Sequence, residues 1–134
     1  ARLGYREGTS TMERIAEAAV PRIADFKPQE LSNIVWAFAR AGVRAPRLFD
    51  AVAAEAVGRL GDFKPQELAN AAWAFARAGH PAPAFFRAIA REAARLLPSF
   101  KGQELTNLAW AFATCRVAAP ALFDAVAAEA AGRA

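Results

Sequence analysis

The chain has 134 residues, of which 55% are hydrophobic and 22% are charged, a composition typical of globular proteins rather than disordered or fibrous ones. The net charge of +4 is compatible with a polyanionic partner, and equally with arginines that only solubilise an alanine-rich surface. The single cysteine excludes an internal disulfide, and no apolar run reaches the roughly 18 residues that could cross a bilayer. More than a quarter of the residues are alanine, the best helix former, which favours an all-α protein.

The first predicted element is a helix over residues 12–25, preceded over residues 1–11 by a tail or by the remnant of an earlier helix. Met12 and Ile15 correspond to Phe49 and Val52 of a helix further along, so we interpret residues 12–25 as half a repeat. No targeting peptide is visible, and the chain does not begin with Met. We therefore expect a segment of a longer protein.

The rest of the chain repeats one phrase three times. "FKPQELSNIVWAFARAG", "FKPQELANAAWAFARAG" and "FKGQELTNLAWAFATCR" begin 37 residues apart, and each is followed by a second apolar segment. A fixed period of this length is the signature of stacked structural repeats. Residues 12–134 are therefore predicted to form one helical-repeat domain, with whole repeats over residues 26–62 and 63–99 and a truncated one over 100–134.

Each repeat is predicted to open with a helix, which in the first copy runs from Pro28 to Ala41. Proline suits the first helical turn, and Glu30 can accept a hydrogen bond from the free N–H at the helix start. Glycine follows the helix as Gly42 and Gly79, where it supplies the left-handed residue that ends many helices. In the third copy Gly102 replaces the proline and Arg116 replaces the final glycine, which predicts a weaker start and a weaker stop.

A second helix is predicted from Pro46 to Leu60. Its apolar residues fall on one stripe at helical spacing: Phe49, Val52, Ala53, Ala56, Val57 and Leu60. Because a pair of short helices cannot bury such stripes alone, we predict a stacked array. The expected fold is a right-handed α-solenoid of about 3.5 repeats, with the handedness taken by analogy with other helix-pair repeats.

A helical wheel of the first helix separates an apolar side with Leu31 and Phe38 from a polar side with Gln29, Asn33 and Arg40. Stacking would align these polar groups in rows that could hold a repeating polymer backbone. The candidate RNA-binding residues are Lys27, Gln29, Ser32, Asn33, Arg40, Lys64, Gln66, Ala69, Asn70, Arg77, Lys101, Gln103, Thr106, Asn107 and Thr114. The asparagines could instead bond to a neighbouring loop, and packing between repeats is the simpler explanation of Trp36, Trp73 and Trp110.

Basic residues suggest where phosphates would bind. Lys27 and its copies precede the first helices, where free N–H groups favour anions. Arg87, Arg91 and Arg95 form a secondary basic strip on the second helix of the middle repeat, explained equally well as a solvated face.

The sequence offers almost no material for catalysis. His80 stands alone in a Gly-His-Pro turn, no serine has an adjacent base, and no cluster of cysteine and histidine has zinc spacing. Cys115 takes the place of alanine in the other copies, which indicates a small buried residue. We expect no enzyme activity, no metal, no cofactor and no small-molecule substrate.

The phrase "FKPQELANAAWAFARAGHPAP" resembles the octotricopeptide-type repeats of organelle proteins. It is similar also to the helical repeats beside RAP domains, in FAST-kinase-like proteins and in RNA-editing substrate-binding complex proteins. The resemblance covers residues 12–134 and is most specific at Phe63, Pro65 to Leu68, Asn70, and Trp73 to Ala74. It departs at Lys64, because these families commonly have Asn or Ser as the helix cap.

The resemblance implies binding of single-stranded RNA in a mitochondrion or plastid, in RNA processing, stability or translation. Two alternatives from the residues stay open. The constant Asn and Trp rows suit an armadillo-like scaffold that holds a peptide or protein partner, and the segment could be only a spacer within a larger array. No membrane partner is expected.

Overall fold

The computed structural model describes the backbone of residues 2–133 and the side chains of residue 8 and residues 10–133, and the described residues contain helices but no strands. The α-helices are α1 (Arg2–Ala19), α2 (Pro28–Ala41), α3 (Pro46–Val57), α4 (Pro65–Ala78), α5 (Pro83–Leu96), α6 (Gly102–Cys115) and α7 (Pro120–Arg133). Short 3₁₀ helices follow three of them: η1 (Val20–Asp25), η2 (Leu60–Asp62) and η3 (Leu97–Ser99). The prediction of an all-α protein is confirmed.

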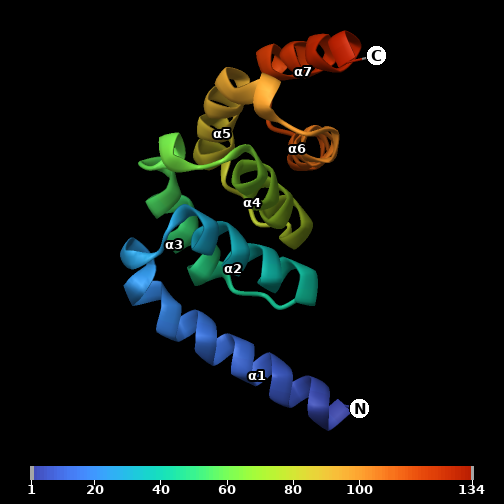
Figure 1. Cartoon of the computed structure of the whole chain (residues 1–134). Helices are drawn as coiled ribbons and strands as arrows, with labels where there is room; N and C mark the ends of the chain where they lie inside the picture. The colour runs from blue at the N-terminus through green and yellow to red at the C-terminus, as the bar shows by residue number, and fades with distance from the viewer. Residues whose placement is uncertain (1, 134) are drawn as a thin grey trace.

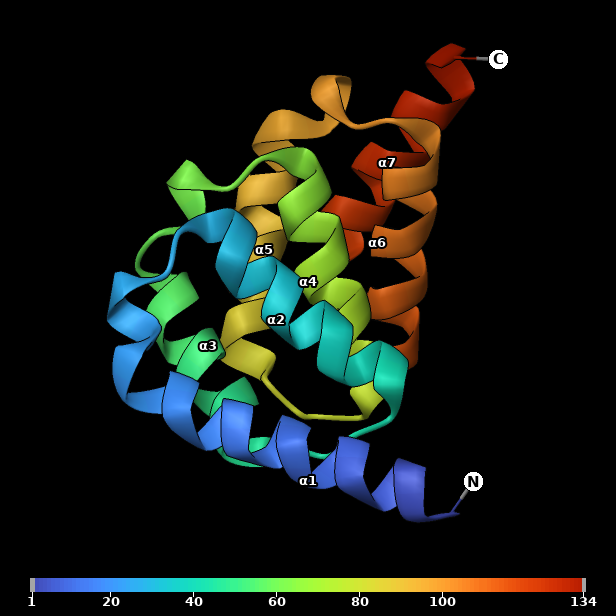
Figure 2. The same cartoon turned by 60° about the horizontal axis from the view of Figure 1, so that its bottom comes forward.

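The helices form two layers. Helix α4 packs side by side with both α2 and α6, and this first-helix layer has the most extensive contacts in the molecule (Figures 1 and 2). In the other layer α5 lies between α3 and α7, and α1 contacts α3 and η1. Helices α1 and α7 lie at opposite ends of the stack (Figure 1). The repeat boundaries and the handedness stay predictions.

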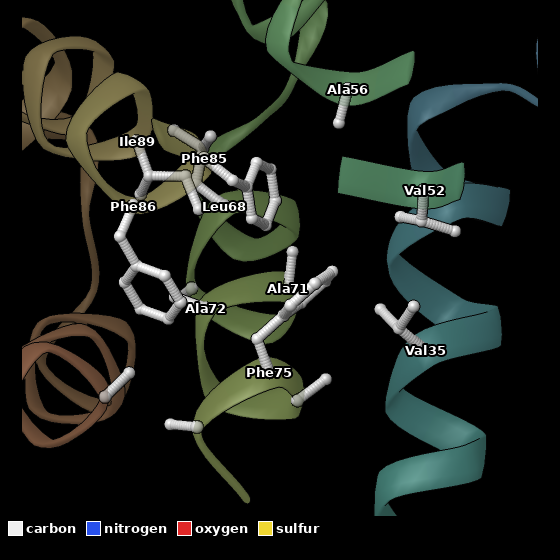
Figure 3. Packing of buried hydrophobic residues seen from close by; sticks show 14 of the residues in the cluster. Val35, Val52, Ala56, Leu68, Ala71, Ala72, Phe75, Phe85, Phe86 and Ile89 are labelled. Carbon is white, nitrogen blue, oxygen red and sulfur yellow. The ribbon is translucent and has the colours of Figure 1, made fainter. Parts of the chain in front are cut away.

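Phenylalanines connect the successive helix pairs between the two layers. The ring centroids of Phe49 and Phe75 are 4.9 Å apart, those of Phe75 and Phe85 4.8 Å, and those of Phe86 and Phe112 5.1 Å. All five side chains are almost completely buried and belong to one core cluster with Val35, Val52, Leu68 and Ile89. Figure 3 labels these four together with Phe75, Phe85 and Phe86. Tilted and edge-to-face ring pairs of this kind add about 0.5–1.5 kcal/mol each to the effect of burial.

The three first helices begin in the same way. The backbone N–H of Lys27 donates to Glu30 Oε1 at 2.7 Å, and the equivalent bonds of Lys64 and Lys101 are 2.8 Å long. A lysine side chain has no acceptor and cannot return a bond to the helix N–H groups, so only the glutamate half of a capping box forms. Helix α6 begins in the same register although Gly102 replaces proline.

The ends of the first helices follow the prediction. Gly42 and Gly79 adopt the left-handed conformation, with φ of 71° and 67°. The next residue in each case, Val43 or His80, donates its N–H back to a carbonyl in the last turn of the helix. Arg116 also has a positive φ, 55°, in the part of the chain that the structure describes, but Val117 makes no such bond there. The stop of α6 is therefore weaker.

The predicted bounds of the second helix are wrong by three residues, because α3 ends at Val57 rather than Leu60. Gly58 follows it, whereas α5 has Arg95 at the matching position and continues to Leu96. Glycine is a poor helix former, which explains the difference. Val57, expected on the apolar stripe, is 42% exposed, and Leu48 is buried instead.

We predict that Gly79→Ala lowers the free energy of unfolding by about 1 kcal/mol, because an alanine Cβ is strained at positive φ. Gly58→Ala is the matched control. Its φ is −81° and nothing lies within 4 Å of a Cβ there, so it should be neutral or stabilising by about 0.5 kcal/mol. Urea unfolding of both variants measures the difference, and equal effects would contradict the role assigned to Gly79.

Candidate nucleic-acid interface

One side of the first-helix layer faces solvent and carries the same kinds of side chain on each helix. We call this surface the first-helix face. On each helix a glutamine, an asparagine, a tryptophan and then an arginine or threonine succeed one another at spacings of three or four residues, which places them on one side of the helix. The residues are Gln29, Asn33, Trp36 and Arg40 on α2, Gln66, Asn70, Trp73 and Arg77 on α4, and Gln103, Asn107, Trp110 and Thr114 on α6.

The three tryptophans form a regular row across this face. The ring centroids of Trp36 and Trp73 are 6.4 Å apart and those of Trp73 and Trp110 are 6.5 Å apart, with interplanar angles of 37° and 35°. Trp36 is 38% exposed and Trp110 is 43% exposed. The rings therefore pack against one another, as expected for packing between repeats, and the outer two also present apolar surface to solvent. The guanidinium of Arg40 lies 5.5 Å from the centre of the Trp36 ring, within the range of a cation–π contact.

Amides occupy the next two positions on the same face. In α6 the Gln103 side-chain amide donates to Asn107 Oδ1 at 3.2 Å, which confirms for that helix that the two amides stand in line. Gln29, Gln66 and Asn33 are exposed, and Asn70 is half-buried. The amides provide donors and acceptors without charge.

Three of the candidate residues, Ser32, Ala69 and Thr106, lie away from this face. Ser32 and Ala69 are buried against the next first helix, and Ser32 Oγ donates to the Glu67 carbonyl of α4 at 3.0 Å. Thr106 is exposed, and its hydroxyl bonds to the Gly102 carbonyl of its own helix. Ser32 therefore lies on the flank by which α2 packs on α4, and a ligand would not reach the buried Ser32 and Ala69.

The predicted basic groups fall in different places. Lys27, Lys64 and Lys101 are exposed where the first helices begin. Arg87 and Arg91 are exposed on α5, while Arg95 at the end of the strip pairs with Glu92.

Two pockets open between the loops that join first to second helices. The first loop pocket lies between the α2–α3 and α4–α5 loops and is lined by residues that include Arg44, Arg77 and His80. The second loop pocket lies between the α4–α5 and α6–α7 loops and is lined by residues that include His80, Arg87, Thr114 and Arg116. Sequence reasoning named Arg77, Arg87 and Thr114 separately but did not find the pockets.

His80 lies in the wall between the two pockets. Its Nε2 is 2.6 Å from Asp50 Oδ1, and its ring lies 5.5 Å from that of Phe49 and 5.8 Å from that of Phe75. The histidine that stood alone in the sequence therefore joins the α4–α5 loop to α3. In the sequence, the one hint of this pair is that Asp50 and His80 lie in adjacent repeats.

Comparison with known families gives a match over nearly the whole chain. The sequence model of the RNA-editing substrate-binding complex 6 protein matches residues 1–133. The chain belongs to this family. Membership in the RNA-editing substrate-binding complex 6 family implies a role in an RNA-editing complex and supports that part of the resemblance, while the likeness to octotricopeptide and RAP-associated repeats stays a prediction. No curated protein matches the chain.

The remaining features of this family member that bear on its function are its cysteine, its possible metal ligands and the apolar character of its helices. Burial raises the pKa of the Cys115 thiol, which keeps it protonated and weakly nucleophilic at neutral pH. Within the described residues, no three His, Cys, Asp or Glu side chains gather where they could hold a metal. None of the described helices is long and apolar enough to cross a bilayer.

We predict that Ser32→Ala lowers the free energy of unfolding by about 0.5–1.5 kcal/mol, because it removes a part-buried hydrogen bond between α2 and α4. Thr106→Ala is the control, since its hydroxyl bonds only within its own helix at an exposed position, and it should change stability by less than about 0.5 kcal/mol. Urea unfolding compares the two. If Thr106→Ala lowers the free energy of unfolding as much as Ser32→Ala, the stabilising role assigned to the Ser32 hydrogen bond is contradicted.

Proposed function

We propose that this chain is a single-stranded RNA-binding module of an RNA-editing factor, and that the RNA lies across the first-helix face. The observation that carries the proposal is the row of partly exposed tryptophans, regularly spaced and flanked by amides and arginine. Aromatic rings that stack bases beside a basic groove are the usual means by which proteins hold single strands without strict sequence preference. The proposal includes no catalysis and no cofactor.

The proposed scaffold is a right-handed α-solenoid with a 37-residue period. The first helices begin at Pro28, Pro65 and Gly102, which are 37 residues apart, and the same glutamate bond stabilises each start. Such a scaffold presents equivalent side chains at regular intervals, which suits a polymer ligand.

The proposed location is the mitochondrion. It rests on membership in the RNA-editing substrate-binding complex 6 family. Nothing in the comparison favours a plastid.

We predict that Trp110→Ala weakens RNA binding by about 1–3 kcal/mol, because one stacking surface is lost. Phe123→Ala is the matched control, since Phe123 is 36% exposed on α7 and lies outside the first-helix face. The measurement is the fluorescence anisotropy of a labelled oligo-uridine of about 12 nucleotides, long enough to contact several repeats.

Salt dependence provides a second readout for the same probe. Binding should weaken steeply between about 50 and 200 mM salt if several phosphates are contacted. Quenching of the tryptophan fluorescence should accompany binding, because all three tryptophans lie on the first-helix face. No binding by the folded wild-type chain at the lower salt concentration would refute the proposed function.

A second candidate is an armadillo-like scaffold for an extended peptide, favoured by the aligned neutral amides of Gln103 and Asn107. For this function, replacing Asn33, Asn70 and Asn107 together with alanine should abolish peptide capture. For RNA binding, Arg40→Glu with Arg77→Glu should instead be the more damaging change, because it reverses charge beside the bases and phosphates. Anisotropy with the oligo-uridine measures how each variant changes RNA binding. Loss of binding in the asparagine variant alone would count against a charge-dependent RNA site.

A further inference from the structure

The two loop pockets are lined by arginines. Arg44 and Arg77 contribute to the first, Arg87 and Arg116 contribute to the second, and no carboxylate lines either pocket. None of these four arginines forms an ion pair with a carboxylate in the part of the chain that the structure describes, whereas Arg59, Arg95 and Arg133 do. Each pocket is therefore a concave surface with two arginines that pair with no carboxylate among the described residues, and the Asp50 carboxylate is bonded to His80 in the wall that the pockets share. Unpaired arginines in a concave surface favour a polyanion.

Arg116 adds an independent observation. It adopts the left-handed backbone conformation that Gly42 and Gly79 adopt in the other repeats. A side chain in this conformation is strained by roughly 1–2 kcal/mol, and such strain gathers at functional sites. Glycine would end α6 with less strain. Arg116 therefore lowers the stability of the fold relative to glycine, but it places a cation at the second loop pocket.

The position of the tryptophan row decides which end of the first helices the phosphates can follow. Trp36 lies four residues from Arg40 and nine from Lys27, which correspond to about 6 Å and about 13 Å along a helix. The same spacing separates Trp73 from Arg77 and from Lys64. A base and its phosphate are joined through a single sugar and therefore lie close together. A base at the tryptophan row can thus place its phosphate at the arginine end of the helix, but the lysine end is too far away.

The geometry points to the two loop pockets as the phosphate-binding sites of the RNA, with phosphates held by the arginines of successive loops while bases contact the tryptophan row. This inference rests on the proposed function. The lysines at the other end of the first helices then contribute long-range attraction rather than contacts. Neighbouring helices are about 8–10 Å apart, so the pockets recur at a regular interval along the stack.

The test compares salt dependence among charge-matched double variants, with the same labelled oligo-uridine as probe. Arg87→Gln/Arg116→Gly should weaken binding about tenfold and reduce the slope of log affinity against log salt by roughly 1.4, two contacts at about 0.7 each. Arg14→Gln/Arg22→Gln removes the same charge at the α1–η1 end and should leave the slope unchanged. Lys64→Gln/Lys101→Gln tests the opposite end of the first helices and should reduce affinity less than the arginine pair.

Stability separates a binding role from a structural one. Arg116→Gly alone should raise the midpoint of urea unfolding, because the left-handed strain is relieved, and yet weaken RNA binding. A substitution that only damaged the fold would lower both the midpoint of urea unfolding and the affinity for RNA.

Three results would overturn the inference while leaving the proposed function intact. The first is an Arg87→Gln/Arg116→Gly variant that binds RNA with the affinity and the salt slope of the wild-type chain. The second is a larger loss of RNA affinity in Lys64→Gln/Lys101→Gln than in the arginine variant. The third is arginine-dependent binding of polyglutamate with RNA binding unaffected, which would assign the pockets to an acidic peptide. Failure of the wild-type chain to bind RNA at all would instead refute the proposed function itself.

Discussion

The close packing of α2, α4 and α6 is the contact on which the other features of this protein depend. Many of the buried residues of α4 are small: Ala69, Ala71, Ala72, Ala74 and Ala76. Small residues let helix backbones approach to the lower end of the usual 8–10 Å range. The tryptophan rings carried by these three helices lie 6.4 and 6.5 Å from one another, so the aromatic row depends on this helix packing.

The same packing explains why equivalent residues have different surroundings. Ala74 on α4 is buried between two neighbours, whereas Ala37 on α2 is exposed because α4 covers only one flank of that helix. Trp73 is likewise half-buried between two rings, while Trp36 and Trp110 each have one ring neighbour. An outer tryptophan therefore offers more surface to a ligand than the central one, although all three occupy the same position in the repeated sequence.

Local signals made the first helices predictable. Their bounds depend on residues that act within one turn: Pro28 and Glu30 at the start, and Gly42 at the end. The tryptophan and amide positions could be predicted from helical spacing alone. The flank that buries Ser32 could not be assigned, because a helical wheel does not show on which side the next helix packs. The loop pockets were missed for a similar reason, since they exist only between residues of different repeats, such as Arg87 and Arg116.

The equivalence of the two contacts that α4 makes has an evolutionary consequence. Its face toward α2 and its face toward α6 join helices of nearly identical sequence, so a second copy of the stretch from Phe63 to Ser99 would fit beside the first. Duplication of these 37 residues in frame would lengthen the array by one helix pair with one tryptophan and one loop pocket position, without new packing solutions. The number of stacked helices in such a protein can therefore change by unequal recombination, one module at a time.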